Sequence, residues 1–422
     1  MSPSPHLTAY FNRIVAAVLD ANGRGERRLA PTAAAGRRTG RAVRPRGTPG
    51  RGGFCLVYNP DKWYPVQIGE VYESRYQVLL KLGFGSASTV WLCRDLQKHC
   101  YVTLKVYETG HRQARNEEVV LRHLERLESE HPGQKLLRSI KDSFELQGKI
   151  GPHVCLVFET LGLSLADIRE LAGGKLPENL LKGLIYGLLL GIDYMHSVAH
   201  VVHTDIQDGN IMLSISDTTI LDDLVNEEWR LPSARKVMSD RTTYASTGLE
   251  IPDDPGDPVI SDFGDAQYGE GDFDGEVMPD LYRAPEIILG IPWDEKIDIW
   301  ALGLMVWDLF EGKLLYNTRH RDRNASRAAH FARTVSLLGP PPDDLLDRGS
   351  TWKDFFDEEG KLIVDGEIPE SSFEEEECNL EGAEQAEFLV FLRKMLQWKP
   401  EDRLSARELM EDPWLCRQTA DD

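Results

Sequence analysis

The sequence lacks the features that mark membrane proteins, zinc proteins and disulfide-rich secreted proteins. Its strongest apolar run, from Gly183 to Ile192, is about ten residues long, which is too short to span a bilayer. Its six cysteines include no C-x-x-C pair, so neither a zinc site nor a disulfide framework is indicated. We therefore expect a soluble protein of a reducing compartment, in the cytoplasm, the nucleus or both, that does not bind membranes.

Basic residues are scarce relative to acidic ones. The chain has 48 Lys and Arg against 69 Asp and Glu, which gives a formal net charge of −21. This sign is unfavourable for a nucleic-acid-binding surface and favourable for the binding of basic partners. We therefore expect no direct binding of nucleic acid, and basic peptides are plausible substrates.

The length and the hydrophobic content exclude disorder of the whole chain. With 422 residues, of which 41% are hydrophobic, the chain can form about two to three domains with a sizeable core. The first 53 residues differ, because they hold ten Arg and two acidic residues, which leaves +8 here and −29 for the remainder. We predict that residues 1–53 form a disordered Arg-rich tail. The same composition permits a mitochondrial targeting segment.

The remaining chain changes character along its length. From Arg75, short β-branched and aromatic runs broken by glycines or polar residues predict three antiparallel strands. After Leu136 the pattern is mainly helical, with long apolar segments around residues 178–198, 296–311 and 384–397. The sequence therefore predicts an α+β protein, with a small β-rich part followed by a larger α-helical part.

A glycine-rich turn lies between the first two predicted strands. It runs from Leu82 through Gly83 and Gly85 to Val90, and Ser88 replaces the third glycine of a G-x-G-x-x-G motif. Glycines at such a turn allow backbone N–H groups to approach phosphate oxygens closely. By itself this signal is weak, since many hairpins carry two glycines.

Lys105 strengthens that signal. It lies on a predicted strand whose alternation places Val102, Leu104 and Val106 on one face and Thr103 and Lys105 on the other. An isolated strand lysine is usually a solvated edge residue. This one follows the glycine-rich turn at the spacing that a protein kinase requires.

A carboxylate on the following helical stretch could hold Lys105 by an ion pair. We assign this role to Glu118, which precedes the apolar positions Val119, Leu121 and Leu124. The neighbouring Glu117 remains an alternative.

Three further motifs occur in the order found in protein kinases. His203, Asp205 and Asn210 match H-x-D-x-x-x-x-N, and they are followed by Asp262-Phe263-Gly264 and by Ala284-Pro285-Glu286. In phosphoryl transfer, Asp205 would accept the proton of the substrate hydroxyl. Asn210 and Asp262 would hold Mg²⁺ against the phosphates, and Lys105 would neutralise phosphate charge.

Over about residues 58–416, the chain resembles the SR-protein kinases (serine/arginine-rich protein kinases), within the larger group of cyclin-dependent and MAP kinases. One feature is the lead-in "YPVQIGEVYESRYQVLLKLGFGSASTVWLCRDL", and another is Thr204 in place of the usual arginine. The third is a short insertion at about 214–258. Asn210 and Asp262 are 52 positions apart, against the roughly 15 to 20 that two short strands and a turn need.

The resemblance implies a bilobal protein kinase fold, with an N-lobe at 54–160 and a C-lobe at 161–422 that contains the insertion. It implies ATP and Mg²⁺ as cofactors, and serine residues of basic, Arg/Ser-rich proteins as the phosphate acceptors. We expect a monomer.

The resemblance also assigns a nucleotide pocket. Phe158 should border the back of the adenine site, and backbone groups of Glu159 and Leu161 should meet the adenine edge. The other residues assigned to the pocket are Leu82, Gly83, Gly85, Val90, Thr103, Lys105 and Met212. Two structural roles are implied as well: Asp298 should brace the catalytic-loop backbone, and Arg403 should pair with Glu286.

Three departures from the family pattern bear on activity. Gln207 replaces a lysine that contacts the transferring phosphate, and Thr103 replaces the usual alanine of the adenine pocket. The segment from Asp262 to Glu286 carries no Ser or Thr, so we expect a loop fixed in its active form without phosphorylation. Gln207 leaves an alternative open, a pseudokinase or scaffold that presents acidic surfaces such as 374–377 to partners.

Overall fold

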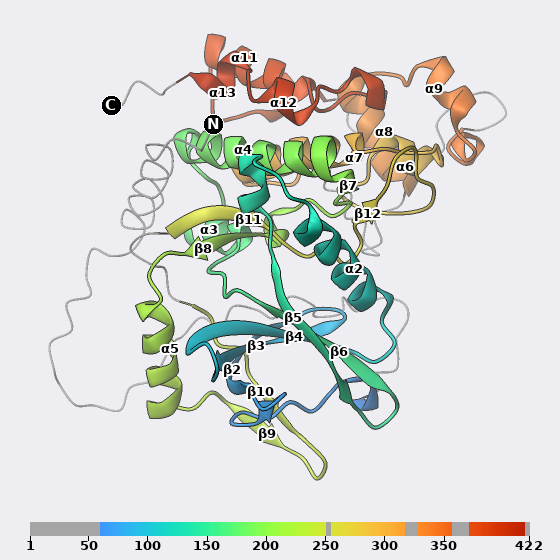
Figure 1. Ribbon diagram of the computed structural model, residues 1–422. Helices are drawn as coiled ribbons and strands as arrows, with labels where there is room; N and C mark the ends of the chain where they lie inside the picture. The colour runs from blue at the N-terminus through green and yellow to red at the C-terminus, as the bar shows by residue number, and fades with distance from the viewer. Residues whose placement is uncertain (1–59, 250–254, 317–326, 357–370, 418–422) are drawn as a thin grey trace, which may run out of the picture.

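The computed structural model describes residues 60–249, 255–316, 327–356 and 371–417. It has a small lobe built on a β-sheet and a larger lobe built from helices (Figure 1). The bilobal α+β fold predicted from the sequence is therefore confirmed. The predicted tail at 1–53 lies outside the described residues. Its targeting role, the location of the protein and its oligomeric state stay predictions.

Six antiparallel strands form the sheet of the small lobe, in the order β1-β2-β3-β4-β6-β5. Their bounds are β1 Val71–Tyr72, β2 Tyr76–Phe84, β3 Ser88–Asp95, β4 Cys100–Tyr107, β5 Ile140–Gln147 and β6 Pro152–Phe158. The three strands predicted after Arg75 are confirmed as β2, β3 and β4. Val102, Leu104 and Val106 join one hydrophobic cluster with residues of β2, β3 and β6, which leaves Lys105 on the opposite face of β4.

The helices lie mostly in the large lobe, where α7 forms the centre. Every residue of α7 from Ile297 to Phe310 is buried. The three apolar segments predicted as helices are confirmed as α4, α7 and α11. The helices are α2 Arg112–Arg126 beside the small-lobe sheet, then α3 Leu165–Leu171, α4 Glu178–Tyr194, α6 Pro285–Leu289, α7 Lys296–Glu311, α8 Arg327–Leu338, α9 Asp343–Arg348, α10 Phe373–Glu376, α11 Gly382–Arg393, α12 Ala406–Leu409 and α13 Pro413–Cys416. None of the helices in the described ranges is long and apolar enough to cross a membrane.

Two short hairpins bring the catalytic motifs together. Strand β8, Ile211–Ile215, pairs with β11, Pro255–Ile260, and β7, Val201–Val202, pairs with β12, Gln267–Tyr268. Asp205 and Asn210 lie between β7 and β8, and Asp262 lies between β11 and β12. The two pairings therefore place residues more than 50 positions apart in sequence in one site.

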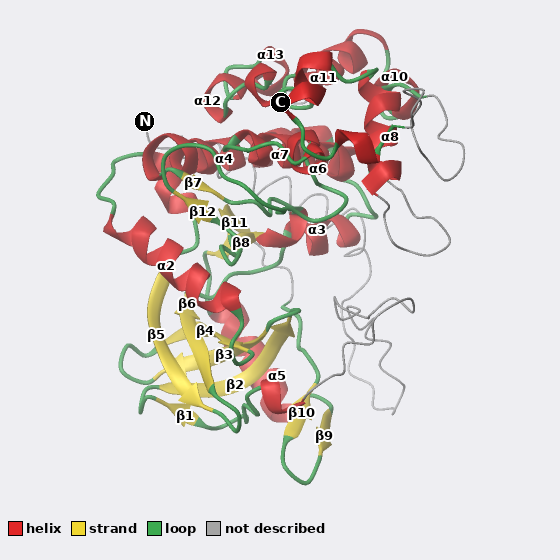
Figure 2. Cartoon of the chain, turned by 90° about the vertical axis from the view of Figure 1, so that its right-hand side faces the viewer, coloured by secondary structure: helices red, strands yellow, loops and turns green. Residues whose placement is uncertain are grey.

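The insertion between β8 and β11 folds against the small lobe, although its sequence lies within the range of the large lobe (Figures 1 and 2). It contains α5 Thr219–Arg230, β9 Arg235–Val237 and β10 Thr242–Tyr244. Leu221 and Leu224 of α5 form one hydrophobic cluster with Leu80 and Leu92 of the sheet. The Tyr101 hydroxyl donates to the carboxylate of Asp222. The insertion thus covers part of the sheet.

Candidate active site

Lys105 occupies the centre of the candidate site. Its Nζ lies 2.9 Å from Oε2 of Glu117 on α2 and 3.0 Å from Oδ1 of Asp262. Burial alone would lower the pKa of Lys105, but the charges of Asp262 and Glu117 raise it well above its usual value. Lys105 therefore carries a fixed positive charge and joins α2 to the D-F-G motif.

The assignment of Glu118 as the partner of Lys105 is wrong, and the alternative Glu117 is right. Glu117 is 1% exposed, whereas Glu118 contacts Arg115 of its own helix and Ser143 of β5. The reason is helical phase. The inward face of α2 carries Ala114, Glu117, Leu121 and Leu124 at spacings of three and four residues, and Val119, taken as an apolar inward position, is 48% exposed.

Tyr107 is a member of this cluster that sequence reasoning missed. Its hydroxyl donates to Oε2 of Glu117, the oxygen that also faces Lys105. The Lys105 ammonium lies 4.9 Å from the centre of the Tyr107 ring. The signal in the sequence is its position two residues after Lys105 on a strand, which places both side chains on one face.

The carboxylate of Asp205 is fixed by two neutral amides. Its Oδ1 accepts from Gln207 at 2.6 Å, and its Oδ2 accepts from Asn210 at 2.6 Å. Burial raises the pKa of Asp205 to about 7, with the charge of Asp262 acting in the same direction and the two amide bonds opposing it. An aspartate of this kind is suited to take up a proton near neutral pH.

Asp298 at the start of α7 braces the loop that carries Asp205, as predicted. Its two carboxylate oxygens accept from the backbone N–H groups of His203 and Thr204 at 2.7 and 2.8 Å. Thr204 has a left-handed backbone with φ 68°, and so does Asp262 with φ 69°. Such conformations are strained for these residue types, and the surrounding bonds hold them in place.

The ion pair predicted between Arg403 and Glu286 is also present. Two parallel bonds of 2.7 Å join the guanidinium to the carboxylate, and both side chains are fully buried. This bidentate pair ties the A-P-E motif to the end of the large lobe.

Helix α2 also contacts the segment that follows Phe263. The Asn116 amide donates to the carbonyl oxygens of Gly264 and Ala266 at 3.0 and 2.8 Å. Arg112 and Gln113 both bind the carboxylate of Asp265. These residues were not identified from the sequence. They hold the start of the segment against α2. That the loop is fixed in its active form without phosphorylation stays a prediction.

The residues predicted to form the nucleotide pocket lie on β2, β3, β4, β6 and β8 and in the turns that follow β2 and β6. Gly83 pairs with Val90 across the β2–β3 hairpin, and nothing lies within 4 Å of the position a Cβ would take on Gly83. The Gly85 N–H is bonded to Ser88 O at 2.8 Å, which closes the turn. The glycine-rich turn therefore has room on its surface for a ligand. Leu82 packs against the cluster that joins the sheet to α5.

The predicted hinge follows β6. Phe158 and Leu161 are buried, whereas the Glu159 side chain is 68% exposed and pairs with Lys141. The Glu159 side chain therefore faces solvent, and the contact of its backbone groups with the adenine edge stays a prediction. Thr103 is buried, and its hydroxyl donates to the hydroxyl of Thr160 at 3.3 Å.

Met212 lies on β8 and contacts a residue that the sequence did not single out. Nη1 of Arg138 lies 3.9 Å from the Met212 sulfur, and the Arg138 guanidinium lies over the ring of Phe158. The motif patterns gave no signal for Arg138, because it lies in a loop between two elements.

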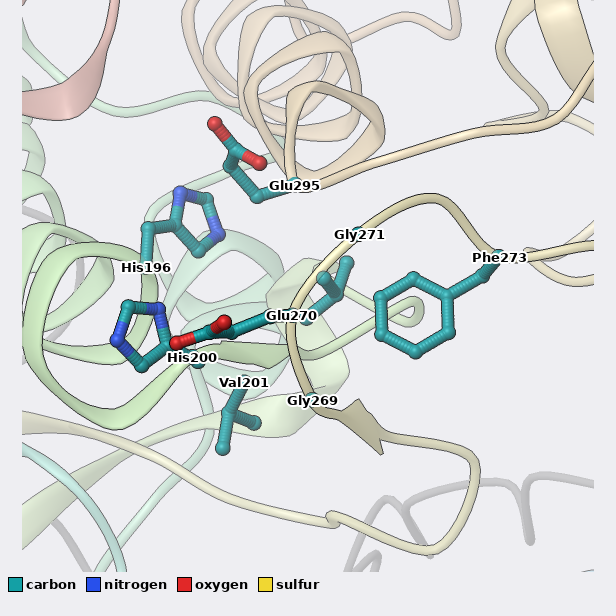
Figure 3. Close-up of a pocket in the computed structure, with 9 residues that line it drawn as sticks. His196, His200, Val201, Gly269, Glu270, Gly271, Phe273 and Glu295 are labelled. Atoms are coloured by element: carbon teal, nitrogen blue, oxygen red, sulfur yellow. The ribbon is translucent and has the colours of Figure 1, made fainter.

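A separate cavity of about 190 Å³ lies behind the catalytic loop, and none of the predicted site residues lines it. Figure 3 shows His196 and His200 on one side and the loop from Gly269 to Phe273 on the other. The His196 Nε2 is bonded to Asp298 at 3.0 Å. This cavity therefore borders the brace of the catalytic loop and is distinct from the nucleotide pocket.

The fold and this arrangement of charges define a protein kinase, and comparisons with known proteins agree. The chain matches the protein kinase domain over residues 76–415. A serine/threonine protein kinase of Aspergillus fumigatus is 42% identical over 365 residues, covering 84% of this chain and 88% of that protein. The serine/threonine-protein kinase SRPK of Physarum polycephalum is 31% identical over 394 residues, covering 85% and 90%.

A more distant relative is SRSF protein kinase 3 of Homo sapiens, 24% identical over 503 residues that cover 84% of this chain and 88% of that protein. The chain belongs to the SR-protein kinase family and is a serine/threonine protein kinase.

Proposed function

We propose that this kinase transfers the γ-phosphate of ATP, with Mg²⁺, to serine hydroxyls of basic, Arg/Ser-rich proteins. The observation that carries the proposal is the convergence of Lys105, Asp205 and Asp262 at the lobe junction of a chain with a net charge of −21. One relative is named as an SRSF protein kinase, which supports the proposed substrate class.

Asp205 is the proposed general base. The bonds from Gln207 and Asn210 hold both of its oxygens, so the carboxylate keeps one orientation toward an incoming hydroxyl. Because its pKa is raised to about 7, Asp205 can accept the serine proton at neutral pH and release it afterwards.

Asn210 and Asp262 are the proposed metal ligands, and their oxygens fit the preference of Mg²⁺ for hard oxygen donors. Asn210 donates to Asp205 through Nδ2, which leaves its side-chain oxygen for a cation. Half of the Asp262 side chain is exposed, and Lys105 lowers its pKa, so it is ionised. When bound, the metal would neutralise phosphate charge, and Lys105 would contact the phosphates from the other side.

Acidic residues gather on the segment between the D-F-G and A-P-E motifs, which lies beside the catalytic loop. Five of them are exposed: Glu270, Asp272, Asp274, Glu276 and Asp280. Glu276 and Asp280 pair with arginines. The acidic run at 374–377 is likewise partly neutralised, because Glu374 pairs with Arg393 and Glu376 pairs with Arg333. The negative charge nearest the site therefore favours basic substrates.

A phosphotransfer assay tests the proposal. The full chain is incubated with Mg²⁺ and radiolabelled ATP, with either an Arg-Ser repeat peptide or a neutral peptide of equal length and equal serine content. We expect transfer to serine with a higher kcat/KM for the Arg-Ser peptide. Equal kcat/KM values for the two peptides would contradict the proposed substrate class.

A further inference from the structure

The side of the nucleotide pocket behind Phe158, called here the wall behind Phe158, contains the guanidinium group of Arg138. The backbone N–H of Arg138 donates to the carbonyl of Ile260 at 2.9 Å, which anchors the residue two positions before Asp262. Its guanidinium carbon then lies 4.2 Å from the centre of the Phe158 ring, and its Nη1 reaches the sulfur of Met212. Arg138 thus lies between two residues assigned to the nucleotide pocket.

The hydrogen-bonding capacity of this guanidinium is largely unused. Its Nε is buried without a hydrogen-bond partner in the described part of the chain, and a thioether sulfur is a weak acceptor for Nη1. Within the same ranges, Arg138 forms no ion pair, because the nearby carboxylates of Glu117 and Asp262 are taken by Lys105. A desolvated guanidinium has five N–H donors and favours any ligand group that can accept from them.

We propose that Arg138 is a specificity-determining residue of the nucleotide pocket. Its guanidinium makes the wall behind Phe158 cationic, so this wall favours ligand groups that accept hydrogen bonds or carry negative charge and disfavours apolar groups. A wall of aliphatic side chains would have the opposite preference, because burial of apolar area would then drive binding. The inference deepens the proposed function and rests on the nucleotide site assigned there.

One consequence concerns ligands that are bulky at the purine. The aromatic ring of Phe158 now covers Arg138 by a cation–π contact. Removal of the ring in Phe158→Gly would therefore expose a cation and not an apolar space. An analogue with a benzyl group on N6 should bind this variant weakly, and an analogue with a carboxybenzyl group should bind it well.

The experiment measures this difference in the full chain. The dissociation constants of N6-benzyl-ATP and N6-(4-carboxybenzyl)-ATP are compared in Phe158→Gly and in Phe158→Gly combined with Arg138→Met or with Arg138→Lys. Methionine keeps an unbranched side chain without charge, and lysine keeps the charge. With Arg138 we expect the carboxylated analogue to bind about tenfold or more tightly than the benzyl analogue. The preference should be lost with methionine and retained with lysine.

A second measurement leaves Phe158 in place. Guanine has an acceptor oxygen at the position where adenine has an amino donor. We therefore expect the affinity for GTP relative to that for ATP to fall in Arg138→Met and to persist in Arg138→Lys. This comparison tests the inference even if the Phe158→Gly variants do not fold.

The outcomes separate this inference from the proposed function. If the native chain binds no ATP, the nucleotide site and everything that rests on it are wrong. If all variants bind ATP and both affinity ratios are the same with arginine and with methionine, the inference about Arg138 is overturned, while the proposed kinase reaction stands.

Discussion

The proposed catalytic base, Asp205, is held by two amides, and no cation among the described residues directly contacts its carboxylate. Asp205 must be ionised to accept a proton, and its pKa is raised to about 7, mainly by burial. The ionised fraction grows as the pH rises through this value. We therefore expect kcat, measured at saturating ATP and peptide and constant ionic strength, to rise from about pH 6 to about pH 8 with a midpoint near 7. A flat profile over this range would contradict the assignment.

Gln207 is the departure from the family pattern that lies nearest to the proposed base. Its amide donates to Asp205, so the position keeps a contact with the base and lacks the positive charge that would face the transferring phosphate. Gln207→Lys should raise kcat, by up to about 30- to 1000-fold if the full ~2–4 kcal/mol is recovered. The same charge favours the carboxylate form of Asp205, so the midpoint of the pH profile should move down.

The matched control for this variant is Gln207→Met, which has a side chain of similar length without an amide. It should lower kcat below that of the native chain, because one bond to Asp205 is lost. If neither the native chain nor Gln207→Lys transfers phosphate while both bind ATP, the chain acts as a nucleotide-binding scaffold.

The roles of Asp205 and Asp262 can be separated by what each variant loses. Asp262→Ala should abolish Mg²⁺-dependent binding of ATP, because it removes a metal ligand. Asp205→Asn should leave ATP affinity nearly unchanged and lower kcat, since the base acts on the incoming hydroxyl. Calorimetric titration with ATP in the presence and absence of Mg²⁺ measures the first effect, and peptide kinetics measure the second. Equal loss of ATP affinity in both variants would refute this division.

Sequence reasoning located the site residues that belong to motifs and missed those that depend on helical phase or on tertiary contact. Lys105, Asp205 and Asp262 are fixed by spacing within short patterns. Glu117 and Glu118 are adjacent, so the choice between them depends on which face of α2 is turned inward. The apolar pattern used to find that face included Val119, which is exposed, and so it favoured Glu118. Arg138 could not be predicted, because its role arises only where a loop meets Phe158 and Met212 in space.

At the scale of elements, the least predictable feature is the position of the insertion. The partners of α5 in the sheet, Leu80 and Leu92, precede it by more than 120 residues, and no local pattern links them. The strand and helix assignments were accessible because alternation and helical periodicity are local properties. The docking of α5 on the sheet follows instead from the burial of Leu221 and Leu224.

Substitution of Leu224 tests whether this docking stabilises the small lobe. Leu224 is 6% exposed in the cluster with Leu80, so Leu224→Ala should lower stability by about 2 kcal/mol or more through lost burial and an unfilled cavity. The control is Asn226→Ala on the exposed side of α5, which should have little effect. Thermal unfolding followed by circular dichroism provides the comparison. Equal melting temperatures for native chain and Leu224→Ala would show that α5 does not stabilise the sheet.

At the scale of the whole molecule, charge is distributed unevenly along the chain. Residues 1–53 carry +8, and residues 54–422, which contain the kinase fold, carry −29. A negative surface around a site raises the local concentration of cationic peptides and accelerates their association. The substrate preference of this kinase should therefore be partly electrostatic and should respond to salt.

Salt dependence separates this long-range attraction from direct recognition of arginine. Interactions between exposed charges are screened over about 10 Å at 0.1 M ionic strength, so kcat/KM for an Arg-Ser peptide should fall steadily as salt is added. The value for a neutral serine peptide of equal length should change little, and it serves as the control for effects of salt on the enzyme itself. The ratio of kcat/KM for the Arg-Ser peptide to kcat/KM for the neutral peptide should thus fall, mainly because KM for the Arg-Ser peptide rises. A preference that stays constant with salt would contradict steering by net charge and would require buried, directional contacts to arginine near Asp205.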